Sequence, residues 1–219
     1  MSKYRYLAMA AASALVVAAS AGAANAVATH VLTEGSAGGT AVAPGAVLTA
    51  GLAKGSSVSY TLKSMKLTCK SSMLTATVST NPVAKGTADE SLTAQTVSHC
   101  TVNVKHVSIA SLKTLNLPFN VTVSDAAGFP VKVSGRSKSK PLAFSVLVQA
   151  GKLKIPCTYS AASITGHASN KGNVISIKNQ KFKFTAGSHK YCLASANVSA
   201  TFGPVKDSSV TGKPSVFVN

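Results

Sequence analysis

Few side chains in this sequence could carry out acid–base chemistry. The 219 residues include only five acids: Glu34, Asp89, Glu90, Asp125 and Asp207. A glycosidase needs two carboxylates that face each other across a bond, and the only neighbouring pair is Asp89 and Glu90. Adjacent residues of a strand point to opposite faces, and this pair lies in a polar segment, KGTADES, that is typical of a solvated turn. The acids therefore predict no glycosidase site.

Nucleophilic and metal chemistry find equally little support. Serine is abundant and five histidines are present, but no G-x-S-x-G elbow appears. His99 and His106 are seven residues apart, which places them on opposite faces of a strand and argues against a shared metal. A phosphate loop and a dinucleotide fingerprint are also missing. We therefore expect a protein that is not an enzyme and that holds no cofactor and no metal.

The cysteines are better explained by structure than by catalysis. The sequence has an even number of them: Cys69, Cys100, Cys157 and Cys192. In an exported protein this predicts disulfides, and four cysteines allow three pairings. Their wide spacing does not fit the short paired spacing of structural zinc sites.

The excess of lysine is the one unusual feature of the composition. The formal net charge is +17, with 22 basic residues against five acids. Trp is absent and aromatic residues are few, which argues against a specific nucleic-acid module. Scattered lysines suit adhesion to an anionic cell-wall polymer or membrane surface, and they also protect strand edges from aggregation. The candidates for polyanion binding are Lys132, Arg136, Lys138, Lys140, Lys178, Lys181 and Lys183.

The N-terminus has the features of a secretory signal peptide. Lys3 and Arg5 precede an apolar run from residue 7 to about residue 19, and the sequence Ala24-Asn25-Ala26 fits a signal-peptidase site. The run is shorter than the roughly 20 residues that a membrane-spanning helix needs. We therefore expect residues 1–26 to be removed, and the protein to be secreted, either extracellular or on the cell surface.

The remaining sequence predicts an all-β protein. Residues 27–55 are rich in Gly, Ala and Ser and predict a flexible lead with at most one strand. Residues 56–219 alternate apolar and polar side chains in short runs, as half-buried strands do. The strongest runs are 57–63, 74–80, 101–109, 119–124, 130–135, 142–150, 173–179, 181–186 and 196–203. This pattern indicates an antiparallel β-sandwich or a barrel-like fold.

Two segments of the chain resemble each other. KLTCKSSMLTATVS begins at Lys66 and KIPCTYSAASITGHAS begins at Lys154, and they match if the second has one or two extra residues. The next cysteine follows 31 residues after Cys69 and 35 residues after Cys157. We therefore expect two related halves, 56–135 and 142–207, each closed by its own disulfide: Cys69–Cys100 and Cys157–Cys192.

A wider resemblance rests on the segment from Cys157 to Pro204, which contains C-x-Y-S, S-I-T-G, I-x-I-x-N-Q-x-F and S-A-T-F-G-P. It resembles a recurring module in uncharacterised exported proteins of Streptomyces-like actinobacteria. The first half is similar to the companion part of those proteins, in which a Trp is expected where this chain has Phe119. The resemblance implies an exported β domain with no assigned activity, so it assigns no role to any residue.

These observations favour a secreted, non-enzymatic structural or binding protein of the cell envelope. Its basic surface would associate with anionic polymers. Alternating strands without helices are also the pattern of a membrane-active or pore-forming β-barrel, which is a second hypothesis. A secreted hydrolase is a third. The sequence indicates neither the oligomeric state nor a specific partner.

Overall fold

The computed structural model describes residues 29–185 and 189–219, and this part of the chain is all β. It contains sixteen strands and no helix, so the prediction of a barrel-like all-β fold is confirmed. Among these residues there is no helix of the length and hydropathy needed to cross a membrane. The predicted signal peptide, residues 1–26, lies outside the described residues.

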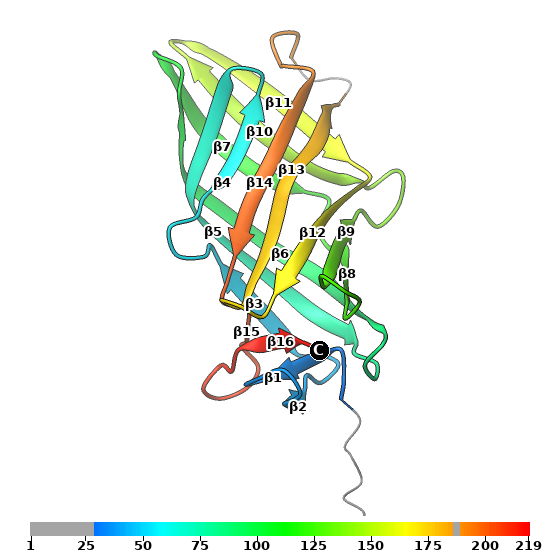
Figure 1. The fold of residues 1–219 in the computed structure, drawn as a ribbon. Coiled ribbons are helices and arrows are strands. Elements are labelled where there is room, and N and C mark those ends of the chain that lie inside the picture. Colours follow the sequence, from blue (N-terminus) through cyan, green and yellow to red (C-terminus); the bar gives the residue numbers. More distant parts are fainter. Residues whose placement is uncertain (1–28, 186–188) are drawn as a thin grey trace, which may run out of the picture.

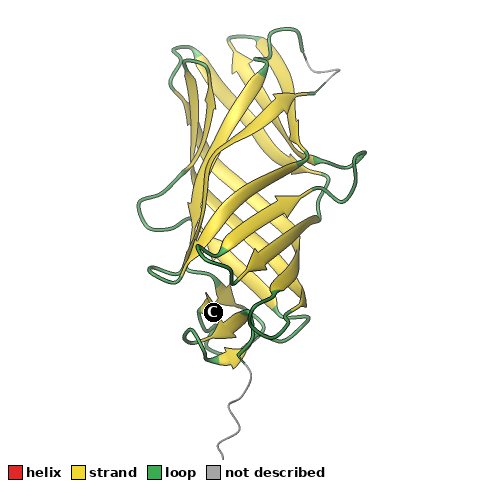
Figure 2. Cartoon of the chain, turned by 45° about the vertical axis from the view of Figure 1, so that its right-hand side comes forward, coloured by secondary structure: helices red, strands yellow, loops and turns green. Residues whose placement is uncertain are grey.

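Eight antiparallel strands close into a barrel (Figures 1 and 2). The order around the barrel is β12-β9-β8-β6-β5-β4-β14-β13, and β13 pairs back to β12. Their bounds are β4 (Val58–Leu62), β5 (Met65–Thr80), β6 (Thr87–Val102), β8 (Phe119–Ser124), β9 (Pro130–Ser134), β12 (Ser163–Ser169), β13 (Val174–Phe184) and β14 (Ser195–Phe202). Apolar and polar residues alternate along these strands. Closure into a barrel therefore turns the apolar face of every strand into the lumen.

Three further strands extend the barrel at one end. They are β7 (Val107–Leu115), β10 (Leu142–Ala150) and β11 (Leu153–Ala161), and they join β13 in the order β13-β11-β10-β7. We call these strands, with β4 and the adjoining parts of β5, β6, β13 and β14, the upper tier. The remainder, with β8, β9 and β12, is the lower tier. The turns at the far end of the upper tier form the hairpin end, at the top of Figure 1.

A small sheet covers the opposite, capped end (Figure 1). It consists of β1 (Leu32–Glu34), β2 (Thr40–Ala41) and β16 (Val216–Val218), and β3 (Val47–Gly51) with β15 (Lys206–Asp207) lies beside it. The buried Asn81 side chain joins this sheet to the barrel: it accepts a hydrogen bond from Leu32 N and donates to Leu32 O and Val42 O, at 2.8–2.9 Å. The capped end therefore contains both described termini of the chain.

This arrangement differs from the flexible lead expected for residues 27–55. The described part, from residue 29, contains three strands, and Val31, Leu32 and Val42 are at most 2% exposed. The partner of β1 is β16, at the other end of the sequence. A pairing over that separation gives no local signal, so composition alone indicated a loop.

Most of the predicted strands coincide with observed ones, but the run at 101–109 does not form a single strand. β6 ends at Val102 and β7 begins at Val107, with a tight turn between them in which Val107 N donates to Val104 O. His106 has a positive φ of 61°, which helps the chain to reverse in this turn. Val104 therefore lies at a hairpin tip, 41% exposed, instead of inside a sheet.

Both predicted disulfides are present. Cys69 faces Cys100 directly across the β5–β6 ladder, with Cα atoms 3.9 Å apart, closer than is usual for a disulfide. Cys157 on β11 is bonded to Cys192, which follows β13, with Cα atoms 5.6 Å apart. The two bonds support an oxidising, extracellular type of environment. Both lie in the upper tier.

The two similar segments have comparable positions in the barrel wall. The first is the single strand β5, which runs through both tiers. The second is divided into β11 and β12, and the division at Ala162 falls where the second segment has its extra residues. The common origin of the two halves stays a prediction, but the insertion has a visible structural effect.

The first prediction concerns the disulfides. Replacing either pair by alanine should lower the free energy of unfolding by about 3–4 kcal/mol, because each bond closes a loop of a few tens of residues. C157A/C192A should also speed amide exchange in residues 189–194, because this disulfide holds a segment outside the strands. C69A/C100A should not, because residues 69 and 100 remain on the paired strands β5 and β6. Urea unfolding and hydrogen exchange measure both effects. Equal exchange in the two variants would contradict the assignment.

Candidate functional site

A groove on the outer wall contains three of the predicted polyanion-binding residues. Its volume is about 690 Å³, and Lys138, Lys181 and Lys183 line it with three serines. The lysines come from the loop between β9 and β10 and from β13, and the serines are Ser137, Ser160 and Ser163. No acid lines the groove. We call it the lysine groove.

The groove exists because the barrel wall is interrupted beside β13. β11 pairs with β13 only at Tyr159–Phe184 and Ser160–Lys183, and β12 pairs with it from Gly166 onward. The segment between these contacts leaves that edge of β13 without a ladder partner. Lys181 and Lys183 alternate with the buried Phe182, so both side chains face outward.

The third lysine is brought to the groove by a tight loop between β9 and β10. Gly135 N donates to Ala162 O at 3.2 Å, and Ser137 forms a bridge with Lys140. A Cβ atom on Gly135 would collide with the backbone of Lys140 and Pro141. Glycine is therefore required for the loop to close back toward the junction of β11 and β12.

The other predicted residues lie nearby without lining the groove. Arg136 and Lys140 are exposed on the same loop as Lys138. Lys132 is on β9, where it pairs with Thr165 of β12. Lys178 is exposed at the irregularity of β13 between Ile177 and Gln180. The sequence identified the basic residues but could not indicate which three converge.

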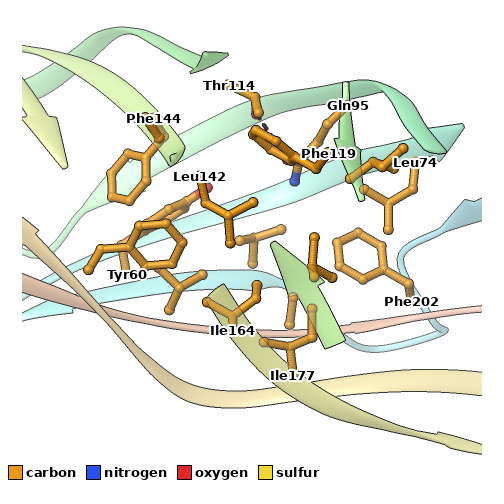
Figure 3. Close-up of a pocket in the computed structure, with 17 residues that line it drawn as sticks. Tyr60, Leu74, Gln95, Thr114, Phe119, Leu142, Phe144, Ile164, Ile177 and Phe202 are labelled. Carbon is orange, nitrogen blue, oxygen red and sulfur yellow. Dashed lines mark hydrogen bonds between the residues drawn. The ribbon is translucent and has the colours of Figure 1, made fainter. Parts of the chain in front are cut away.

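The lumen of the barrel contains a series of apolar cavities. Figure 3 shows one of about 100 Å³, with Tyr60, Phe144, Leu142 and Phe202 among its lining side chains. Tyr60 and Phe144 also line a larger cavity of about 260 Å³ toward the hairpin end. Two smaller cavities, of about 60 and 30 Å³, continue toward the capped end. The core is therefore packed around a discontinuous central space.

Three polar side chains of the upper tier, those of Thr114, Gln95 and Tyr60, line the cavity of about 100 Å³. Thr114 Oγ1 donates to Gln95 Oε1 at 2.9 Å, which links the side chains of the neighbouring strands β7 and β6 (Figure 3). The Tyr60 side chain is only 5% exposed, and its hydroxyl has no hydrogen-bond partner among the described residues. Burial raises the pKa of this phenol, so it stays protonated and available as a donor.

The position of Glu90 shows that the segment KGTADES is not the solvated turn predicted from the sequence. We expected a solvated turn, but Thr87 begins strand β6, and Ala88, Glu90 and Leu92 share its inner face. Asp89 points outward and accepts a hydrogen bond from Thr80 at 2.9 Å. Glu90 lines both of the small cavities among apolar neighbours such as Val205 and Ile175. Burial raises the pKa of Glu90 to about 7. The alternation of Ala88, Glu90 and Leu92 is the sequence signal that could have revealed it.

A second pair of carboxyl groups lies at the capped end. The side chains of Glu34 on β1 and Asp207 on β15 are neighbours. Burial is the main cause that raises the pKa of Glu34, and the hydrogen bond and charge of Asp207 add to it. Asp207 Oδ1 also accepts from Ser209 N at 2.7 Å. This pair lies within the cap. Because Glu34 and Asp207 are far apart in the sequence, nothing in the sequence indicated that they are neighbours.

These groups do not assemble into a metal centre. Within residues 29–185 and 189–219, no three His, Cys, Asp or Glu side chains are grouped so as to hold a metal ion. Glu90 lines two small cavities of the lumen, the Glu34–Asp207 pair lies in the cap, and none of the three lines the lysine groove. The lysine groove, where three charged side chains converge, is therefore the best candidate for a functional site.

Comparison with known proteins adds no homologue. No protein-family model, no curated protein and no solved structure matches this chain.

The second prediction concerns Glu90. Below about pH 4.5 Glu90 is neutral in the folded and unfolded chains; between pH 4.5 and 7 only the unfolded chain loses this proton. Stability should therefore fall across this window by up to about 3 kcal/mol. Glu90→Gln should remove that fall and stabilise the protein at pH 8. Urea unfolding at several pH values measures it, with Asp89→Asn as the outward-facing control. A fall that persists in Glu90→Gln would contradict the assignment.

Proposed function

We propose that this protein is a secreted, non-enzymatic binding protein of the cell envelope, and that the lysine groove binds an anionic polymer. The observation that carries the proposal is the convergence of Lys138, Lys181 and Lys183 on one groove with no acid in its lining. Three cations that line a single depression attract an extended polyanion more strongly than the same charges spread over the surface.

The remaining lining suits a phosphate- or carboxylate-bearing chain. Ser137, Ser160 and Ser163 supply hydroxyl groups that can donate to anionic oxygens or to sugar hydroxyls. Lysine contributes point charges without the fixed geometry of arginine, so it favours a repeating charge over one shaped ligand. Both features support a polymer over a small, specifically oriented metabolite.

Export is the second element of the proposal. The two disulfides fit an oxidising compartment, and residues 1–26 have the charge, apolar run and cleavage pattern of a signal peptide. A protein that leaves the cell with a formal charge of +15, after loss of Lys3 and Arg5, meets the anionic polymers and lipids of the envelope first.

The lumen supports binding over pore formation. The core side chains of the barrel, among them Tyr60, Phe144 and Phe182, are buried inside it. A channel-forming barrel has the reverse arrangement, with a polar interior and an apolar exterior band. Outward-facing positions such as Thr61, Lys132 and Lys181 are exposed and polar.

The third prediction tests the groove. The variant K138Q/K181Q/K183Q should bind purified cell-wall fragments and a soluble polyphosphate about tenfold more weakly at low salt, and the slope of log affinity against log salt should decrease by about two. Co-sedimentation and calorimetry over a salt series measure these quantities.

The matched control is K171Q/K206Q/K213Q, which removes the same charge at exposed lysines outside the groove. This control variant should keep most of the wild-type affinity for the polymer. An equal loss in both variants would mean that net charge alone attracts the polymer. No binding of the wild type at low salt would overturn the proposed function.

A further inference from the structure

The largest of the four lumen cavities described above lies at the hairpin end. Its volume is about 260 Å³, and its lining includes residues at the very ends of the upper-tier strands: Leu62 of β4, Met65 of β5, Val107 of β7 and Ala150 of β10. The disulfide-bonded segment with Tyr191 and Cys192 forms its side. The lining is almost entirely apolar. We call it the mouth cavity.

An aromatic cluster forms the floor of the mouth cavity. The ring centroid of Phe144 lies 4.9 Å from that of Tyr60 and 5.3 Å from that of Tyr159. Beyond Tyr60 and Phe144 the lumen continues into the cavity of about 100 Å³ shown in Figure 3. An apolar chain that enters from the hairpin end therefore meets a wide section first and a constriction next.

The tips around the mouth combine exposed apolar side chains with lysines. Val104, Leu153 and Tyr191 are 41%, 45% and 61% exposed, on three separate tips. Each has a lysine as a neighbour in the chain: Lys105, Lys152 and Lys190 respectively. Lys190 Nζ also lies 5.4 Å from the centre of the Tyr191 ring. Apolar surface thus continues from the cavity to the solvent, with cations at its edge.

The hairpin end has no negative charge to offset these lysines. Glu34 and Asp207 lie in the cap and on β15, and Asp89 and Glu90 pair with β8 in the lower tier. Asp125 accepts a hydrogen bond from Lys85 N in the turn that follows β5. These five are all the acids of the chain. The mouth cavity is therefore an apolar space inside a purely cationic rim.

We propose that the hairpin end binds a single-chain anionic amphiphile, a long-chain carboxylate, with the alkyl chain in the mouth cavity and the carboxylate among Lys105, Lys152 and Lys190. Burial of the chain supplies affinity and the rim supplies the preference for a negative head group. This site is separate from the lysine groove, so it stands or falls independently of the proposed function.

A series of alkyl carboxylates tests the proposal, each below its micelle concentration and titrated by calorimetry into the mature protein. Affinity should rise about fourfold for each added methylene and level off when the chain reaches the constriction at Tyr60 and Phe144. Alkyl trimethylammonium ions of equal length should bind about tenfold more weakly, because the rim is cationic. No binding, or equal binding of the two head groups, would overturn the proposal.

Two pairs of variants separate the cavity from the rim. Ala150→Phe fills the mouth cavity and should abolish binding, whereas Ala110→Phe places the same ring on the outer face of β7 and should change nothing. The variant K105Q/K152Q/K190Q should lose the head-group preference but keep the dependence on chain length. K171Q/K206Q/K213Q should behave as the wild type.

Vesicles distinguish capture of one chain from adhesion to a membrane. Wild type and Ala150→Phe are compared on vesicles that contain an anionic phospholipid. If Ala150→Phe retained full carboxylate binding, or if only vesicles and no monomeric carboxylate bound, the hairpin end would be a membrane-docking surface and the proposed cavity site would be wrong. Because Ala150→Phe could disturb folding, its thermal unfolding is compared with that of Ala110→Phe.

Discussion

Closure of the sheet on itself is the constraint on which the rest of this structure depends. β12 pairs with β9 on one side and with β13 on the other, and these two pairings complete the ring of eight strands. Gly166 lies in both pairings, and a Cβ atom there would come within 2.6 Å of Ser176 O. Once the ring is closed, every alternating strand has an enclosed face for its apolar residues, and the sheet has fewer free edges.

A closed ring still has two ends, and the chain treats them differently. At one end, the sheet of β1, β2 and β16 is held by buried or half-buried asparagines. Asn173 Nδ2 donates to Val216 O at 3.0 Å, and the Asn170 side chain exchanges two hydrogen bonds with the backbone of Val218. These amides satisfy backbone groups that have no strand partner. At the other end the described residues surround the lumen with turns and one disulfide-bonded segment, and the cavity of about 260 Å³ lies there.

The strands were predictable because the alternation of apolar and polar residues can be read within each strand alone. The runs 119–124 and 142–150 correspond to β8 and β10 residue for residue. What the sequence could not supply is the partner of each strand. The pairing of β1 with β16, the turn at 103–106 and the break between β11 and β12 all depend on contacts across the fold. The same holds for the site: charge was visible as composition, but convergence of Lys138 with Lys181 required the break in the wall.

The confinement of all five acids to the cap and the lower tier gives the molecule a permanent electric dipole moment. The less positive end lies toward the cap, because the cap and the lower tier contain all five carboxyl groups, and the more positive end lies toward the turns at 103–106 and 151–152. Near a negatively charged surface, within roughly the 8 Å Debye length of physiological salt, such a molecule experiences a torque as well as an attraction. It would arrive already rotated, with the cavity forward and both described chain termini facing away from the surface.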